Sequence, residues 1–427
     1  MFTKVILPNK LRLITVPMSG VSTVTILVMV NTGSNNETKE INGISHFLEH
    51  MFFKGTARRP SSVLIAQELE RLGAYSNAFT GREWTGYLVK VRAPKFGEAL
   101  DLIADIFQHS LIDPAEVEKE RGVILQEYRM YEDDPQRRVG ELFEEVLYGD
   151  QPAGWHIEGT PEHIARISAD ELLDYFLRQY TIENTFVVVA GNLNQTGQGL
   201  EEHIVEAFGA VRAGMPHGRP PVAEQQPTPA LKIRSKETDQ THIVLGVRAF
   251  GIREEAKRYP AVLMSHILGG GMASRLFQEI RVKRGLAYAV GASFDGYITY
   301  GSVASYAGVE HANAMQAIPL ILEEYRKIRE GPVSAEELSR AKESLKGRLA
   351  ISLESSDDLA FYVGGQEVQT GKPMTPEEFF VKIDAVSAED IRAVANEIFR
   401  PERLNLAMVG PIRDAERFQE LLNGFHA

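Results

Sequence analysis

The segment NTFVVVAG at residues 184–191 decides how the chain is organised, because a related segment, RLNLAMVG, occupies residues 403–410, 219 positions later. Both runs are apolar and end in glycine, a pattern that predicts a buried β-strand. The preceding sequence repeats at the same distance. ISADEL at 167–172 returns as VSAEDI at 386–391, each with a serine N-cap and an acidic residue three positions later, which is typical of a helix start. A repeat of this length predicts two homologous domains.

A proline-rich segment separates the two halves. Residues 213–230 contain five prolines, Pro216, Pro220, Pro221, Pro227 and Pro229, and this composition predicts an extended, semi-rigid linker. The chain of 427 residues also exceeds the ~250–300 residues at which single cores stop growing. We therefore expect one domain over residues 1–212, a linker over 213–230 and a homologous domain over 231–427.

The two halves share a mixed pattern of strands and helices. Residues 24–33 resemble residues 243–251, and each is an apolar strand followed by a helix. A hairpin predicted over 75–91 implies antiparallel pairing, and the tight β-α-β rhythm of a nucleotide-binding sheet is missing. We predict an α+β fold of two homologous α/β sandwich domains, each a mainly antiparallel sheet with helices, joined by the proline-rich linker.

Composition excludes several classes of protein. The formal net charge of −12 argues against a nucleic-acid binder, which needs a basic face to neutralise phosphates. The chain has no cysteine, so a transition metal would be held by His, Asp or Glu. No apolar run of signal length opens the chain, and no stretch of 18 apolar residues occurs, so we expect a cytoplasmic protein without a membrane segment.

The segment NGISHFLEHMFFKG at residues 42–55 carries the strongest chemical signal. It predicts a helix that ends at Gly55. On a helix, His46 and His50 share one face and suit a single zinc ion, while Glu49 leans toward the same face and can reach a water held there. A polar helix face with two hydrogen-bonded histidines would give the same string, so a third ligand is needed on another element.

A second predicted helix supplies acidic candidates for that ligand. It begins at Asp113 as N-cap, runs to about residue 131, and has Val123 and Leu125 on its apolar side. Glu120 and Glu127 are seven residues apart and share one face, so one can be a ligand while the other orients a histidine. A solvated acidic face is the alternative interpretation of these glutamates.

These residues resemble the inverted zinc motif H-x-x-E-H of the inverzincins, the family of pitrilysin, insulinase and the mitochondrial processing peptidase. The chain is most similar to the short two-domain bacterial members that resemble the processing peptidase. The family's third ligand is a glutamate at a characteristic distance beyond the motif, and Glu127, rather than Glu120, stands at that distance from His50. The resemblance therefore implies that His46, His50 and Glu127 are the zinc ligands and that Glu120 is an outer glutamate.

The resemblance also assigns roles to residues outside the metal site. It implies that Asn77, Ala78 and Phe79 form an edge strand on which substrate is laid, although Asn77 alone would indicate only a turn. Arg281 and Tyr288 are similar to the family's pair of hydrogen-bond donors to the substrate carbonyl. Without the family, an arginine and a tyrosine near a glycine would indicate only packing or an exposed surface.

The second half is predicted to have lost its metal site. Alignment of the helix start at Ser334 with the one at Asp113 puts Ala341 opposite Glu120 and Arg348 opposite Glu127. A methyl group and a cation do not bind zinc. We therefore expect metal chemistry in the first domain and substrate contacts in the second.

The resemblance implies a zinc-dependent endopeptidase with one zinc ion per chain and Glu49 as general base. Longer family members close four such domains around a peptide, so this two-domain chain is expected to form a homodimer with composite sites that takes peptides or unfolded polypeptides. Two alternatives remain. One is a non-catalytic assembly subunit, like the family's core proteins in a respiratory complex, and the other is a partner that supplies only part of a site.

Overall fold

The computed structural model describes residues 2–425, which form two compact units. Unit 1 comprises residues 2–128, 155–220 and 350–375, and unit 2 comprises 129–154, 221–349 and 376–425. Each unit therefore contains one segment from the other half of the sequence. The proline-rich region has no helix or strand between residues 211 and 229.

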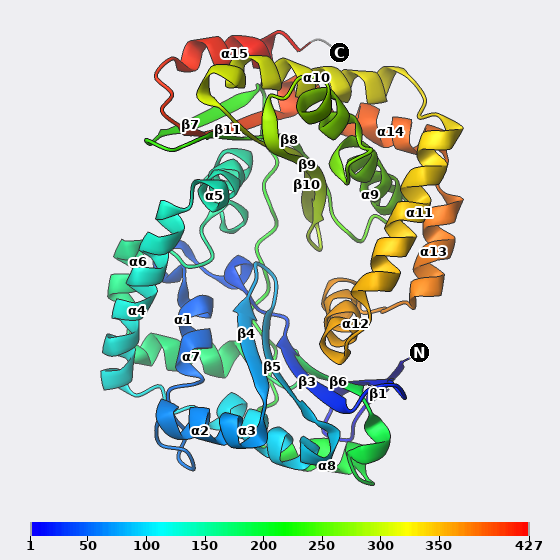
Figure 1. Ribbon diagram of the computed structural model, residues 1–427. Coiled ribbons are helices and arrows are strands. Elements are labelled where there is room, and N and C mark those ends of the chain that lie inside the picture. The colour runs from blue at the N-terminus through cyan, green and yellow to red at the C-terminus, as the bar shows by residue number, and fades with distance from the viewer. Residues whose placement is uncertain (1, 426–427) are drawn as a thin grey trace. The chain divides into compact units, whose positions relative to one another are not determined.

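Unit 1 is built on a six-stranded mixed sheet with the order β1-β2-β6-β3-β5-β4, seen edge to edge in Figure 1. Its strands are β1 (Thr3–Ile6), β2 (Arg12–Pro17), β3 (Thr23–Val30), β4 (Tyr75–Thr80), β5 (Thr85–Arg92) and β6 (Thr185–Gly191). All neighbours pair antiparallel except β2 and β6, which are parallel. The predicted hairpin is confirmed as β4 and β5, and β4 forms one edge of the sheet.

The helices of unit 1 cover both faces of this sheet. They are α1 (Ile44–Met51), α2 (Ser62–Leu72), α3 (Phe96–His109), α4 (Pro114–Asp133, as far as residue 128), α6 (Pro161–Arg166), α7 (Ala169–Gln179), α8 (Leu200–Ala207) and α12 (Ser356–Thr370). On β3, Ile26 and Val28 belong to the core formed with α1 and α3, whereas Leu27 and Met29 belong to the core formed with α12. The central strands β3 and β6 are buried along nearly their whole length because helices cover both faces.

Unit 2 is built on a five-stranded sheet with the order β7-β11-β8-β10-β9. Its strands are β7 (Ala230–Ser235), β8 (Thr241–Phe250), β9 (Ala287–Gly296), β10 (Tyr300–Val309) and β11 (Leu404–Gly410). Its helices are α5 (Pro135–Tyr148), α9 (Glu255–Gly269), α10 (Ala314–Glu330), α11 (Ala335–Ser352, as far as residue 349), α13 (Pro376–Ala385), α14 (Ala388–Ile398) and α15 (Ala415–Asn423). This order repeats that of unit 1, with β11 in the place of β6 and β8 in the place of β3, so the α+β fold of two related sandwiches is confirmed.

The helix on the second face of each sheet comes from the other half of the sequence. In unit 1, α12 packs against β3 and β6, and in unit 2, α5 packs against β8 and β11 (Figure 1). Val363 of α12 contributes to the core with Val188, and Phe143 of α5 contributes to the core with Val409. The compact units consequently differ from a simple division of the chain at the proline-rich segment.

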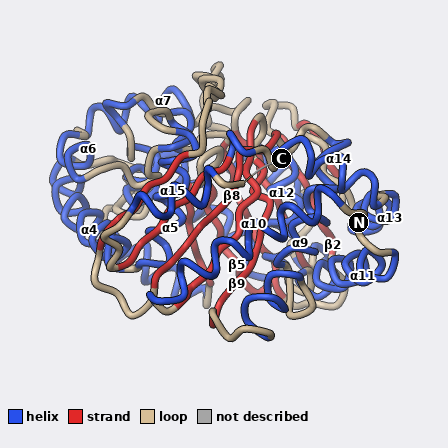
Figure 2. The backbone as a smooth tube through the Cα atoms, turned by 90° about the horizontal axis from the view of Figure 1, so that it is seen from above, coloured by secondary structure: helices blue, strands red, loops and turns tan. Residues whose placement is uncertain are grey.

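Three further features of the fold concern its helices. Among residues 2–425, no helix is long and apolar enough to cross a bilayer. Both predicted capping boxes are present, at Ser168 before α7 and at Ser387 before α14. Figures 1 and 2 both place α4 beside α6, where Arg121 of α4 donates hydrogen bonds to the carbonyl oxygens of Ile164 and Ile167.

Candidate metal centre

Helix α1 carries two of the candidate ligands and is held at its N-terminus by a buried acid. The carboxylate of Glu37, 2% exposed, accepts hydrogen bonds from the backbone N–H of Gly43 at 2.8 Å, the backbone N–H of Ser45 at 2.9 Å and the side-chain amide of Asn42 at 2.9 Å. Negative charge at this end of a helix is favourable. Burial raises the pKa of Glu37 to about 7, although these hydrogen bonds oppose the rise.

Gly43 itself is required where α1 begins. Its φ is +99°, and an added Cβ would lie 2.4 Å from the carbonyl oxygen of Glu158. The chain at Gly43 therefore packs directly on the backbone at residue 158. Only glycine combines this conformation with so close a contact.

The predicted helix over residues 42–55 is wrong in its extent, because α1 covers only Ile44–Met51. Beyond it, Phe52 turns into the core and stacks on Tyr87 at 4.7 Å between ring centroids. Gly55, the predicted stop, lies past this turn with a φ of +152°. Sequence periodicity does not reveal that the helix ends before this buried aromatic residue.

Helix α4 carries the acidic candidates. Asp113 accepts hydrogen bonds from the backbone N–H groups of Ala115 and Glu116, which confirms its capping position. Val117 and Ile124 are buried, whereas Val123 is 47% exposed, so the predicted apolar side is wrong at Val123.

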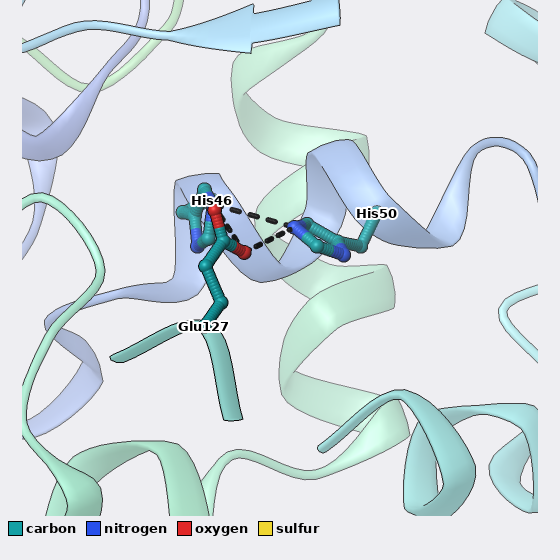
Figure 3. Close-up of side chains that lie close together, drawn as sticks. All are labelled: His46, His50 and Glu127. Carbon is teal, nitrogen blue, oxygen red and sulfur yellow. Dashed lines mark hydrogen bonds and ion pairs between the residues drawn. The ribbon is translucent and has the colours of Figure 1, made fainter. Parts of the chain in front are cut away.

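Three side chains converge where α1 and α4 meet (Figure 3). The Nε2 atoms of His46 and His50 are 3.3 Å apart, and Oε2 of Glu127 lies 3.7 Å from His46 Nε2 and 3.3 Å from His50 Nε2. Two donors bound to zinc at ~2.0–2.1 Å and at the tetrahedral angle are ~3.3–3.4 Å apart. The three atoms thus have the spacing of one face of a zinc tetrahedron, and the donor set is chemically suited to that ion.

Glu120 lies behind this cluster and contacts His50. Its Oε1 is 2.7 Å from His50 Nδ1, and its Oε2 is 2.5 Å from the ammonium group of Lys54. Burial tends to raise the pKa of Glu120, but His50 and Lys54 outweigh this effect and the pKa is lowered. An ionised Glu120 accepts the Nδ1 proton and leaves the lone pair of Nε2 directed at the cluster.

In the metal-free protein, Glu120 and Glu127 control the pKa of His50. Burial lowers its pKa, but hydrogen bonds with Glu120 and Glu127 prevail and raise the pKa to about 9. The side chains around His50 therefore create a strongly negative environment, which favours a cation between His46, His50 and Glu127.

Glu49 is on α1 but is not one of the three converging side chains. Its Oε2 accepts a hydrogen bond of 2.6 Å from the hydroxyl of Thr80, the last residue of β4. Burial raises the pKa of Glu49, with a smaller opposing effect of Thr80. A carboxylate whose affinity for protons is raised beside a metal site is suited to accept a proton from water.

The predicted substrate strand forms part of β4. Asn77 is exposed, Ala78 and Phe79 are partly buried, and β4 is an edge of its sheet. The ring of Phe79 lies over Gly86 on the neighbouring strand and 5.3 Å from the ring of Phe361. Phe79 is thus committed to packing, whereas the outer backbone of β4 is the part of the strand able to pair with an extended peptide.

Arg281 and Tyr288 lie together in unit 2. Arg281 is in a π-helical turn (Phe277–Val282), and its guanidinium lies 4.9 Å from the ring of Phe277 and 4.8 Å from that of Tyr288. Tyr288 lies at the start of the edge strand β9 and is 75% exposed. The pair is pre-organised by stacking and presents a phenol and a guanidinium at one place.

Sequence reasoning missed three residues that shape this centre, namely Glu37, Lys54 and Thr80. Lys54 follows the motif closely and could have been noticed as a cation near a glutamate. Glu37 and Thr80 gave no comparable signal, because their roles depend on a loop and a strand end brought to α1 by the fold.

Comparisons with known proteins agree with this architecture. The profile of the insulinase family (peptidase family M16) matches residues 13–161, and that of the peptidase M16 inactive domain matches residues 166–345. A Bacillus subtilis protein named as an uncharacterized zinc protease, YmxG, is 36% identical over 404 residues, 94% of this chain and 97% of that protein. A similarly named zinc protease of Mycobacterium bovis is 35% identical over 95% of this chain and 92% of its own length.

A solved structure shares the fold. The crystal structure of a protease from Helicobacter pylori superposes with a TM-score of 0.89 at 23% identity and covers 96% of this chain and 99% of the other. The expected resemblance is confirmed, and the chain belongs to the insulinase family, peptidase family M16.

Proposed function

We propose that the protein is a zinc-dependent endopeptidase of the inverted H-x-x-E-H type that holds one zinc ion per chain on His46, His50 and Glu127. The observation that carries this proposal is the spacing of the three donor atoms, 3.3, 3.3 and 3.7 Å apart, which matches a tetrahedral face. The zinc proteases among its relatives support the same reaction class. A zinc ion held by these three residues would keep a coordination position open for water and substrate.

Bound zinc supplies Lewis-acid activation of water and of the peptide carbonyl in such a site. The chain's own residues perform the proton transfers. Glu49 removes the proton of the attacking water and delivers it to the leaving amine. Thr80 fixes the carboxylate of Glu49 in position through its 2.6 Å hydrogen bond. Glu120 holds His50 in the tautomer with Nε2 unprotonated.

Substrate binding is assigned to the edge of β4. A peptide that pairs with the backbone at residues 77–79 gains main-chain hydrogen bonds that do not depend on its sequence. Because β4 ends at Thr80, which contacts Glu49, such a peptide is laid out beside the proposed base. This mode suits extended or unfolded polypeptides and excludes folded ones.

Arg281 and Tyr288 are proposed to donate hydrogen bonds to the carbonyl oxygen as it gains negative charge. Each chain carries both the zinc-site residues and the Arg281–Tyr288 pair. We therefore propose a homodimer with two composite sites, in which Arg281 serves the zinc site of the other chain.

Mixing two inactive variants tests this arrangement directly. Chains with Glu49→Gln and chains with Arg281→Ala should together regain about a quarter of the wild-type activity after random exchange, because half of the dimers contain one intact site.

If both sets act within one chain, the mixture stays inactive. Size measurement of each variant and of the mixture controls for loss of the dimer.

The first test of the reaction is cleavage of a quenched fluorescent peptide by purified protein with and without a chelator. Wild type should cleave and lose activity on chelation. Glu49→Gln should retain its zinc and lose turnover, while Glu70→Gln, which changes an exposed acid on α2, should behave like wild type. If zinc-loaded wild type cleaves none of a varied set of peptides, the endopeptidase proposal is wrong and a non-catalytic subunit becomes the better interpretation.

A further inference from the structure

Unit 2 contains a cavity beside α11, the helix that corresponds to α4 of unit 1. The alignment of the two helix starts puts Arg348 opposite Glu127 and Ala341 opposite Glu120. Both residues line one cavity of about 250 Å³, together with His266 of α9. The positions that carry two acids on α4 therefore carry a cation and a methyl group at this cavity.

Two arginines, Arg340 and Arg348, line this cavity. On α11, Ser344 and Arg348 are four residues apart and face the cavity together. The one acid among the lining residues, Glu337, is bound by Arg275 through two contacts of 2.9 and 2.8 Å.

Arg348 has no counter-charge of its own. Within residues 2–425, the structure gives its guanidinium neither an ion pair nor a hydrogen bond. A second cation at the cavity, Arg340, makes only a 3.5 Å contact with Glu336 on the exposed side of the helix. Both arginines are exposed, and the guanidinium of Arg348 is one positive charge without an ion-pair partner at this cavity, in a chain with a net charge of −12.

The glycines after α9 bring backbone and guanidinium close together. An added Cβ at Gly271 would lie 3.0 Å from Nη2 of Arg348, and one at Gly270 would lie 2.1 Å from Nδ1 of His266. A side chain at Gly270 would clash with the ring of His266, and one at Gly271 would displace the guanidinium of Arg348. Burial and the charge of Arg348 lower the pKa of His266, so its ring is neutral near pH 7 and offers an N–H donor without a charge.

We propose that this cavity is an oxyanion-binding site in which Arg348 binds a carboxylate or phosphate group, with Ser344 and His266 as further hydrogen-bond donors. The proposed anion-binding arginine stands opposite Glu127 in the alignment of α11 with α4. A planar guanidinium is suited to bind two oxygens of one anion. Ile267 and Met272, which also line the cavity, can accept a small apolar group attached to the anion.

The test uses full-length protein treated with chelator, so that no anion binds at the metal centre. Calorimetric titration is done with inorganic phosphate and with an acetylated hexapeptide that ends in either a carboxylate or an amide. Wild type should bind phosphate or the carboxylate peptide, and Arg348→Gln should weaken that binding roughly tenfold or more. Arg348→Lys keeps the charge but not the paired donors, so its affinity for the anion should lie between those of wild type and Arg348→Gln.

A matched control changes an arginine on another helix of unit 2. Arg392→Gln on α14, which removes a surface contact with Glu389, should bind as wild type does, and thermal unfolding confirms that all variants are folded. Binding of the carboxylate peptide but not of the amide identifies a chain terminus as the source of the anion, whereas binding of phosphate alone identifies a free oxyanion. Equal binding by wild type and Arg348→Gln, or no binding of any probe at millimolar concentration, overturns the proposal.

Discussion

The hydroxyl of Thr80 donates a 2.6 Å hydrogen bond to the carboxylate of Glu49, so the last residue of an edge strand holds the proposed base of a neighbouring helix. The proposed substrate strand and the proposed proton acceptor are therefore linked by one side chain. A peptide that paired along β4 would be placed in register with Glu49 by the strand itself.

Replacement of Thr80 by valine keeps the shape of the side chain and removes this hydrogen bond. We expect kcat to fall roughly tenfold, because Glu49 loses the contact that orients it, while KM and zinc content stay near wild-type values. Peptide hydrolysis with metal analysis measures both. Thr80→Ser restores a hydroxyl and should restore most of the activity; an unchanged kcat in Thr80→Val would mean that the hydrogen bond has no part in turnover.

Glu120 is predicted to tune metal affinity without binding the metal. Glu120→Gln should weaken zinc binding by roughly 10–100-fold, because the amide orients His50 less well and leaves Lys54 without its carboxylate partner. Competition with a chromophoric chelator measures the affinity. Glu118→Gln, two residues earlier and exposed on the same helix, is the control and should bind zinc normally, whereas Glu127→Gln should lose far more affinity than Glu120→Gln.

Glu37 is predicted to make stability depend on pH. Its pKa is about 7 in the folded protein against 4.5 for an ordinary glutamate, so the folded state retains a proton that the unfolded chain releases between these values. The contribution of Glu37 to the unfolding free energy is thus most favourable below pH 4.5 and falls by up to ~3 kcal/mol as the pH rises through 7.

Urea unfolding of chelator-treated protein at several pH values tests this dependence. The difference in unfolding free energy between wild type and Glu37→Gln should decrease from acid to neutral pH, because the glutamine does not titrate. Glu40→Gln, which changes a nearby exposed acid, should leave the wild-type profile in place. A difference that is constant with pH would show that Glu37 does not titrate in this range.

Gly43 is predicted to be intolerant of any side chain. Gly43→Ala adds a Cβ 2.4 Å from the carbonyl oxygen of Glu158 and strains a residue with a φ of +99°. The start of α1 must shift, so we expect a loss of ~2 kcal/mol or more in stability together with weaker zinc binding. Gly97→Ala on α3 has open space around the new methyl group and should be neutral or stabilising, which separates a local clash from a general effect of replacing glycine.

The elements predicted best from the sequence were those whose signal is local. The strands at 184–191 and 403–410 have continuous apolar runs, and the capping boxes at Ser168 and Ser387 consist of neighbouring residues. The alignment of the histidines with Glu127 required only helical spacing and a resemblance. These signals predict the α+β fold and the three side chains that converge.

What the sequence did not predict depends on contacts distant along the chain. Directly after α1 ends at Met51, Phe52 packs on Tyr87, which belongs to a later strand. The exposure of Val123 depends on which side of α4 meets the core. The hydrogen bonds of Glu37 and Thr80 belong to a loop and to a strand end that periodicity does not place.

Helices α5 and α12 each complete the unit built mainly from the other half of the sequence, and this exchange affects folding during synthesis. During synthesis the sheet of unit 1 is complete once β6 has emerged, but the apolar surface around Leu27 and Met29 waits for α12, which begins at Ser356. A nascent chain therefore displays one unprotected sheet face while most of the second half of the sequence is translated. Fragments that end between residues 191 and 356 are expected to aggregate, even though they contain His46, His50 and Glu127 of the candidate metal centre.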